Sequence, residues 1–254
     1  MLQWRKKVGG VAMAISRFLE ESRVNVALAI LAVIFVFLAV VVAIAGAVVF
    51  MQEIASGRIP LGGGGLIAVT VVFGILGAIF QLIVLYQWSS AMNQNVKNTE
   101  QVLTSIKERL EDPLRGEVGF FLNRVEEYKI ITWPFWVYLV MYIISLFTGW
   151  YAFLFNLIGF IFVAVYLSSI FKSTNKLSDL KDRIYQYLQE KKGITLPERI
   201  HRIKRYNIIL FIILAVITFT IYWLYLLIKL SLEINRYLES DEKVRTQLEE
   251  AFTR

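Results

Sequence analysis

The sequence contains no cysteine and a single histidine, His201. Disulfides, thiolate metal sites and a cysteine nucleophile are therefore excluded, and one histidine cannot form a multi-histidine metal site. The long apolar runs also lack any charged residue. Ionisable residues inside a membrane segment usually mark an ion path, a proton relay or a catalytic site. Their absence leaves no intramembrane chemistry from which a function can be read.

What the sequence does contain is hydrophobic residues, at 57% of the chain. This exceeds the roughly 45–50% of soluble domains, and five runs come near the roughly 20 residues that cross a bilayer. We predict an all-α polytopic membrane protein, with five transmembrane helices and amphipathic cytoplasmic helical extensions. The expected segments are an amphipathic interfacial helix at 1–23, transmembrane helices 1 and 2 at 24–88 (runs 24–50 and 66–88), a cytoplasmic helical hairpin at 89–129, transmembrane helices 3 and 4 at 130–171 (runs 130–148 and 151–171), cytoplasmic helices with a basic cluster at 172–205, transmembrane helix 5 at 206–228 and an amphipathic polar tail at 229–254.

The basic residues between these runs are unevenly distributed. With the N-terminus in the cytoplasm, the cytoplasmic segments hold 21 of the 27 Lys and Arg residues. The positive-inside rule therefore predicts a cytoplasmic N-terminus and an exterior C-terminal tail. If the run 206–228 instead entered and left on one side, 26 of the 27 would be cytoplasmic. That run is too short for two full crossings, so the exterior tail is preferred.

Two stretches that follow the second and fourth runs repeat apolar residues in steps of three and four, with charged residues between them. This is the heptad pattern of packed helices and coiled coils. A weaker version, with Arg245 at a seam position, follows the fifth run. The seams either pack on each other inside one subunit or form a stalk that joins subunits or binds a partner. The candidate assembly residues are Met92, Val96, Leu103, Ile106, Leu110, Leu177, Leu180 and Ile184.

Two further segments predict helices at the membrane surface. Apolar residues from Trp4 to Phe18 recur at helical spacing, which predicts a helix on the bilayer or on the cytoplasmic face of the protein itself. Thr195 and Glu198 match a capping box, so another helix is expected to begin there. The basic cluster that follows either attracts anionic lipid head groups or serves as a topology signal. The candidate lipid contacts are Arg199, Arg202, Lys204 and Arg205.

Small residues form stripes at four-residue spacing inside the first two runs, as occurs where helix backbones approach closely. They predict packing within the subunit or between subunits. The stripes are Ala39, Ala43 and Ala47, and Thr70, Gly74 and Ala78. The few polar residues of the runs are either helix–helix hydrogen-bonding groups or the lining of a pore. These candidates are Gln81, Asn156, Thr218 and Thr220.

Residues 202–236 contain Thr-Phe-Thr-Ile-Tyr at positions 218–222, followed by aromatic residues and then by Glu233 and Asn235. This resembles a prokaryotic family of uncharacterised small membrane proteins with a Thr-x-Gly-Ile-Tyr motif, aromatics and a Glu and Asn tail. Thr220 stands where the family has glycine. The resemblance implies a membrane helix in a prokaryotic plasma membrane and no particular chemistry.

Enzyme motifs are missing. The glycines at 62–65 lack the Lys and Ser or Thr of a phosphate-binding loop, and the adjacent acid pairs match solvated helix faces. We therefore expect a non-enzymatic protein that acts in assembly, as a homo-oligomer or as a subunit of a larger membrane complex. We expect no cofactor, metal or nucleic-acid partner. The alternative is an oligomeric channel or passive pore with a hydrophobic gate.

Overall fold

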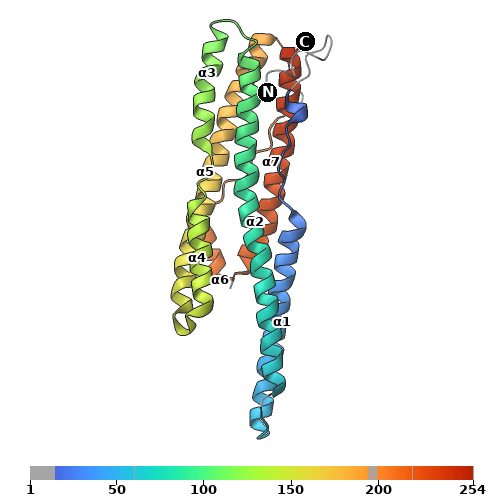
Figure 1. Cartoon of the computed structure of the whole chain (residues 1–254), viewed down its shortest axis with the longest axis vertical. Coiled ribbons are helices and arrows are strands. Elements are labelled where there is room, and N and C mark those ends of the chain that lie inside the picture. Colours follow the sequence, from blue (N-terminus) through green and yellow to red (C-terminus); the bar gives the residue numbers. More distant parts are fainter. Residues whose placement is uncertain (1–14, 60, 194, 196–198, 219, 254) are drawn as a thin grey trace, which may run out of the picture. The chain divides into compact units, whose positions relative to one another are not determined.

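The computed structural model describes residues 15–59, 61–193, 195, 199–218 and 220–253 (Figure 1). Throughout these ranges the regular elements are helices and no strand occurs, which confirms the predicted all-α class. The helices are η2 (Ile15–Phe18), α1 (Val26–Ala55), α2 (Leu61–Lys107), α3 (Leu114–Val125), η3 (Glu126–Tyr128), α4 (Trp133–Phe147), η4 (Gly149–Tyr151), α5 (Ala152–Lys192), α6 (Ile208–Ile217) and α7 (Ile221–Thr253).

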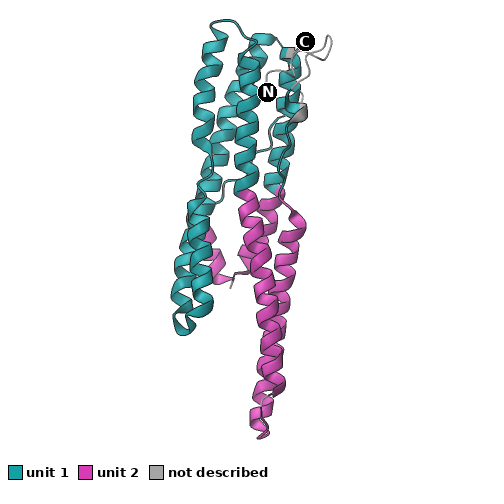
Figure 2. Cartoon of the chain, viewed as in Figure 1, with its two compact units in different colours: residues 1–23, 89–210, 233–254 teal, residues 24–88, 211–232 magenta. Residues whose placement is uncertain are grey.

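The chain divides into two compact units, each built from segments distant in sequence (Figure 2). Unit 1 contains the N-terminal segment up to Arg23 together with residues 89–210 and 233–254. Unit 2 contains residues 24–88 and 211–232. The helices α2 and α7 each contribute to both units, because neither is interrupted where its sequence changes from apolar to polar.

Four segments are long and apolar enough to cross a membrane. They are 26–55, 61–107, 114–147 and 149–192. They include most of the first four predicted runs, and their composition supports a membrane location.

The expectation of a single fifth helix over 206–228 is wrong. The short α6 ends at Ile217, and α7 begins at Ile221. The Phe211 ring lies 5.9 Å from Trp223 and 6.2 Å from Tyr222, so the chain reverses between the two helices. At about 1.5 Å per residue, the 10 residues of α6 extend about 15 Å, half of the hydrocarbon core. The segment is a helical hairpin too short to cross a bilayer.

Side-chain and backbone hydrogen bonds stabilise this reversal. The Thr218 hydroxyl donates to the Leu214 carbonyl at 2.6 Å and accepts from the Tyr222 amide at 3.0 Å. The Thr220 amide donates to the Ala215 carbonyl at 2.8 Å. Thr220 has φ of 71°, in the left-handed region that favours glycine. Glycine is the residue that the Thr-x-Gly-Ile-Tyr motif carries at this place, although the family resemblance itself stays a prediction.

Within unit 2, α1 and the first half of α2 form an antiparallel hairpin joined by a short loop. Its seam uses glycines where backbones meet: a Cβ on Gly63 would lie 2.6 Å from the Cβ of Phe50, and one on Gly77 would lie 2.9 Å from Val36. The Glu53 carboxylate accepts from the amides of Gly62 and Gly63 at 3.0 and 3.1 Å, which caps the start of α2.

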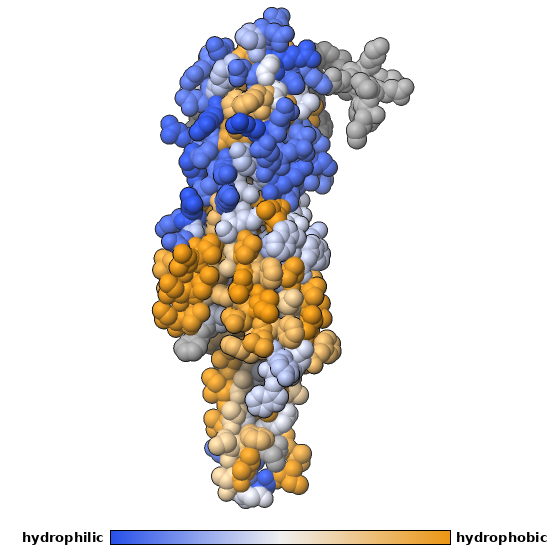
Figure 3. Space-filling model, turned by 90° about the vertical axis from the view of Figure 1, so that its left-hand side faces the viewer, coloured by the Kyte–Doolittle hydropathy of each residue, from blue (hydrophilic) through white to orange (hydrophobic). Residues whose placement is uncertain are grey.

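In unit 1, α4 packs along the first half of α5 through aromatic side chains. Phe135 lies 6.0 Å from Tyr166, and Trp133 lies 5.7 Å from Phe162. Figure 3, viewed from the side of α3 and α4, shows a hydrophilic surface over α3 and a hydrophobic one over α4. The second half of α5 buries a face along its length, from Ile170 to Leu188.

Replacing Thr220 with glycine is expected to stabilise the protein by about 1 kcal/mol, because a β-branched residue in the left-handed region is strained. Thermal unfolding in detergent measures the change. The control Thr70→Gly, inside α2, is expected to destabilise by about 1 kcal/mol, because glycine weakens a helix interior. A Thr220→Gly variant that unfolds as readily as Thr70→Gly would contradict the conformation described at Thr220.

Candidate functional site

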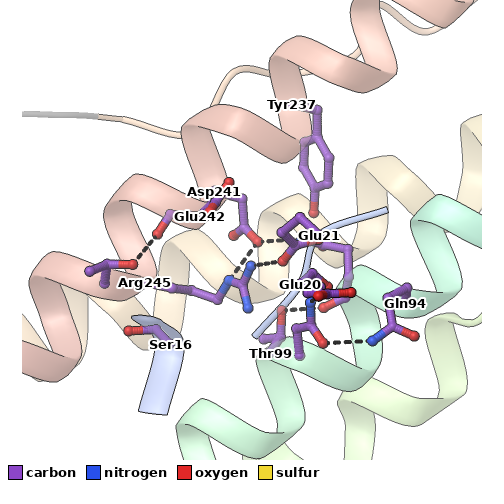
Figure 4. Close-up of polar contacts among 12 residues, drawn as sticks. Ser16, Glu20, Glu21, Gln94, Thr99, Tyr237, Asp241, Glu242 and Arg245 are labelled. Atoms are coloured by element: carbon purple, nitrogen blue, oxygen red, sulfur yellow. Dashed lines mark hydrogen bonds and ion pairs between the residues drawn. The ribbon is translucent and has the colours of Figure 1, made fainter. Parts of the chain in front are cut away.

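The most unusual feature of unit 1 is a cluster of four charged side chains buried inside it. Figure 4 shows three of them, Glu21, Asp241 and Arg245. Lys181 and Asp241 have side chains that are 0% exposed, and Arg245 and Glu21 are 2% and 3% exposed. They come from α5, from α7 and from the segment before α1, and Asn95 of α2 joins them. We call these five residues the buried charged cluster.

Asp241 is the centre of the cluster. Its Oδ2 accepts hydrogen bonds from Lys181 Nζ and from Asn95 Nδ2, both at 2.8 Å, and lies 3.0 Å from Arg245 Nε. Lys181 Nζ also donates to Asn95 Oδ1 at 2.7 Å. Arg245 makes a further ion pair with Glu21, from Nη2 to Oε1. Two positive and two negative charges therefore compensate one another away from water.

Glu249 of α7 binds the N-terminal segment beside the buried charged cluster. Its carboxylate accepts from the Ile15 and Ser16 amides, each at 2.8 Å, and from the Ser105 hydroxyl of α2 at 2.7 Å. Asn98 Nδ2 of α2 donates to the carbonyl of Glu20 at 3.1 Å. Polar side chains of α2 and α7 thus bind the described part of this segment, residues 15–23, in which the regular element is the short η2.

Helical periodicity explains how α7 supplies these groups. Tyr237, Asp241, Arg245 and Glu249 follow one another at four-residue steps, so they lie along one face of the helix. Leu238 and Leu248 are fully buried beside them, and Val244 is nearly so. The face buried in unit 1 is therefore partly apolar and partly charged.

The pKa shifts show how burial and charge compete in the cluster. Burial alone would raise the pKa of Asp241, but the charges of Lys181 and Arg245 and the hydrogen bonds from Lys181 and Asn95 lower it below its ordinary value. Burial lowers the pKa of Lys181 to about 8, against the opposing effect of Asp241. Burial opposes the charge of Arg245, yet Asp241 and Glu21 raise its pKa. At each of the three groups, the neighbouring opposite charge thus acts against the effect of burial on the pKa.

The geometry of the cluster fits a structural role. Its carboxylates are bound by cations and amides inside unit 1, and its Lys and Asp are closed to solvent. Among the residues that the structure describes, no group of three or more His, Cys, Asp or Glu side chains is arranged to hold a metal ion. The arrangement joins four segments in one register, since each charge depends on the others for compensation.

The predicted seam residues are largely buried within the single chain. Leu110 is half-buried, and the other seven are buried. This is the packing expected if the seams meet within one subunit, and it leaves those seven little surface for a partner. The buried residues are Met92, Val96, Leu103, Ile106, Leu177, Leu180 and Ile184.

The segment from Arg199 to Asn207 contains no helix, so the helix expected to begin near Thr195 is absent over this described stretch. Glu198, one of the two residues on which that expectation rested, lies outside the described residues. The candidate lipid contacts Arg199, Arg202, Lys204 and Arg205 are all exposed. The Arg202 guanidinium pairs with Asp179 at 3.1 Å and with Asp182 at 2.5 Å.

Of the predicted pore residues, Asn156 belongs to unit 1, and Gln81, Thr218 and Thr220 belong to unit 2. Thr218 uses its hydroxyl inside the α6–α7 turn, Thr220 lies exposed in that turn, and Asn156 is exposed on α5. Gln81 is half-buried on α2.

The first part of the predicted interfacial helix, up to residue 14, lies outside the described residues. Its remainder is a 3-10 turn at Ile15–Phe18 followed by residues without helix. The contacts of Ser16 and Glu21 with α7 bind this remainder to unit 1.

Of the residues in the buried charged cluster, only Arg245 was marked by a sequence signal, as a charge at a seam position. Lys181 lies on the face that Leu177 and Ile184 share, and Asp241 lies on the partly charged face of α7, but these two partners are 60 residues apart in sequence. Helical spacing says which side chains share a face and does not say which distant charge will meet them.

Comparisons with protein-family models, with curated proteins and with solved structures found no match to this chain.

Replacing Asp241 with asparagine is expected to destabilise the protein by about 3 kcal/mol, because Lys181 and Arg245 would stay buried with one carboxylate between them. Unfolding by denaturant or heat in detergent measures the loss.

The control Glu239→Gln removes a carboxylate two positions earlier on α7. That group pairs with Lys243 at 3.3 Å while about half exposed, so the expected loss is within about 0.5 kcal/mol. Equal effects of the two variants would show that the buried charged cluster does not stabilise unit 1.

Proposed function

We propose that this is a non-enzymatic multi-pass integral membrane protein that acts in assembly, as a homo-oligomer formed through its α1–α2 hairpin. The observation that carries the proposal is the apolar surface that this hairpin leaves uncovered in unit 2. In the apolar 18-residue stretch of α1, only 17% of the residues are buried, and in that of α2 only 11% are buried. Lipid tails, helices of a second copy or helices of another membrane protein can cover such a surface.

Small residues on this surface favour a second copy over lipid alone. Ala43 and Ala47 of α1 are exposed, and a Cβ added to Gly74 of α2 would meet no atom within 4 Å. Of the stripe that begins at Ala39, only Ala39 itself is buried in the hairpin seam. Small side chains let helix backbones approach closely. In a membrane this close packing drives helix association, because lipid tails cover large apolar side chains as well as another helix would.

The open positions of the two helices lie within about two helical turns of one another. A Cβ on Gly46 would lie 3.1 Å from Leu66, and one on Gly77 would lie 2.9 Å from Val36. In an antiparallel pair with this register, Gly74 lies about level with Ala39, one turn from Ala43 and two turns from Ala47. A second hairpin could therefore contact both helices along the same stretch.

The size of the purified protein tests the proposal. In detergent or nanodiscs, native mass spectrometry is expected to give a mass above that of one chain, 29.3 kDa. The double variant Ala47→Ile and Gly74→Ile is expected to shift the protein towards the monomer, because bulk at these positions separates the backbones.

The matched control Ile44→Val and Val72→Ile alters exposed residues of the same two helices without filling the small-residue positions, and it is expected to keep the wild-type mass. A wild-type protein that is strictly monomeric at every concentration and in every lipid would refute assembly through this hairpin.

We further propose that both termini and the polar half of unit 1 lie in the cytoplasm, which replaces the expectation of an exterior tail. The support comes from Glu249 and Arg245 of α7, which contact Ser16 and Glu21 of the N-terminal segment. The hairpin of α6 and α7 lets the chain enter and leave the membrane on one side. This topology also gives the more uneven distribution of basic residues.

Because the chain has no cysteine, single cysteines report its topology directly. Ser56→Cys, in the α1–α2 loop, is expected to react with a membrane-impermeant maleimide on intact cells. Glu239→Cys, exposed on α7, is expected to react only after the membrane is permeabilised. Labelling of Glu239→Cys on intact cells at the rate of Ser56→Cys would place the tail outside and refute this topology.

A further inference from the structure

A groove of about 610 Å³ lies in unit 1 beside the point where α5 leaves its apolar run. Lys172 and Lys176 of α5 line it together with Arg205 of the segment that precedes α6. Phe171 and Tyr206 also line it, with ring centroids 5.3 Å apart. We call this feature the basic groove.

The positive charges of the basic groove are uncompensated within unit 1. Lys172, Lys176 and Arg205 are exposed, and they make no ion pair among the described residues. Lys172 and Lys176 stand four residues apart on one helix face, where like charges repel. The carboxylate that lines the groove, that of Asp179, lies 3.1 Å from Arg202 Nη1 and is thereby neutralised. The groove therefore favours an anion.

The groove also has an apolar end, and its two walls change character at the same place. On α5 the apolar run ends at Phe171, and Lys172 is the next residue. On the other wall Arg205 is the last charged residue before the apolar α6. Both walls thus change from apolar to basic residues at the same place along the groove. Such a change is typical of residues at the depth of lipid head groups. Basic pockets at this depth bind acidic head groups, and each basic residue near the surface adds to the attraction.

We propose that the basic groove is a binding site for the phosphate group of an anionic phospholipid. Lys172, Lys176 and Arg205 contact the phosphate, and the acyl chains extend along the exposed apolar residues at the start of α6. Of the four lipid contacts predicted from the sequence, only Arg205 lines the groove. The other two basic residues of the proposed site are Lys172 and Lys176 of α5. The site lies in unit 1 and does not depend on assembly through the α1–α2 hairpin, so either proposal can fail alone.

Native mass spectrometry of the full chain tests the site by counting bound lipid. Phosphatidylglycerol is titrated against phosphatidylcholine with the same acyl chains, and inorganic phosphate is the soluble competitor. The wild type is expected to retain phosphatidylglycerol preferentially. The triple variant Lys172→Gln, Lys176→Gln and Arg205→Gln is expected to bind it on the order of a hundredfold more weakly, at about fivefold per charge.

The control variant Arg183→Gln, Lys191→Gln and Lys192→Gln removes the same number of exposed charges from α5, away from the groove. It is expected to keep the affinity of the wild type, and both variants are expected to melt like the wild type because the altered side chains are exposed. Equal loss in the two variants, or no loss in the first, would overturn the site. If inorganic phosphate competes as strongly as the lipid, the groove binds a soluble anion, and the proposal that its ligand is a phospholipid is refuted.

Discussion

The burial of four charges inside unit 1 constrains the rest of that unit. Removing an ion from water costs several kcal/mol even after relaxation, so Lys181, Asp241, Arg245 and Glu21 are tolerated only as a complete set. The set is complete only when α5, α7 and the segment before α1 are in register, and Asn95 of α2 adds hydrogen bonds with Lys181 and Asp241. Glu249 adds a second connection between α7 and that segment. The free energy of charge burial thus selects one arrangement among the many that apolar seams alone would allow.

A second polar connection fixes where the C-terminal hairpin begins and ends. Glu233 accepts from the Lys204 amide and from the Tyr206 hydroxyl, each at 3.3 Å, so the residues before α6 lie beside α7 in unit 1. The apolar residues between them reverse at Thr218 and Thr220. A tail held in this way packs with the N-terminal segment, which is why its side of the membrane follows the N-terminus in our proposal. The basic groove is lined on one side by the same stretch of chain.

The seams and the charges between them were predictable to different degrees. Leu177, Leu180 and Ile184 were identified because helical period is local, and each is buried. Lys181 lies four residues after Leu177 and three before Ile184, so spacing places it on the same face, but spacing does not name the partner of a charge buried there. It is buried because α7 brings Asp241 to it from 60 residues away. A face can be read from the sequence, but the element that covers it cannot.

The sequence by itself determined the helical class, the apolar segments that suit a membrane and the absence of thiol chemistry, because hydropathy, helical period and composition are properties of neighbouring residues. Only the tertiary structure decided that residues 206–228 fold back as a hairpin and that polar residues of α2, α5 and α7 meet in one buried charged cluster. Run length gave no sign of the reversal, since the reversal depends on the hydrogen bonds of the Thr218 hydroxyl and on the backbone conformation of Thr220. Ion partners likewise depend on contacts between distant segments, which no local pattern encodes.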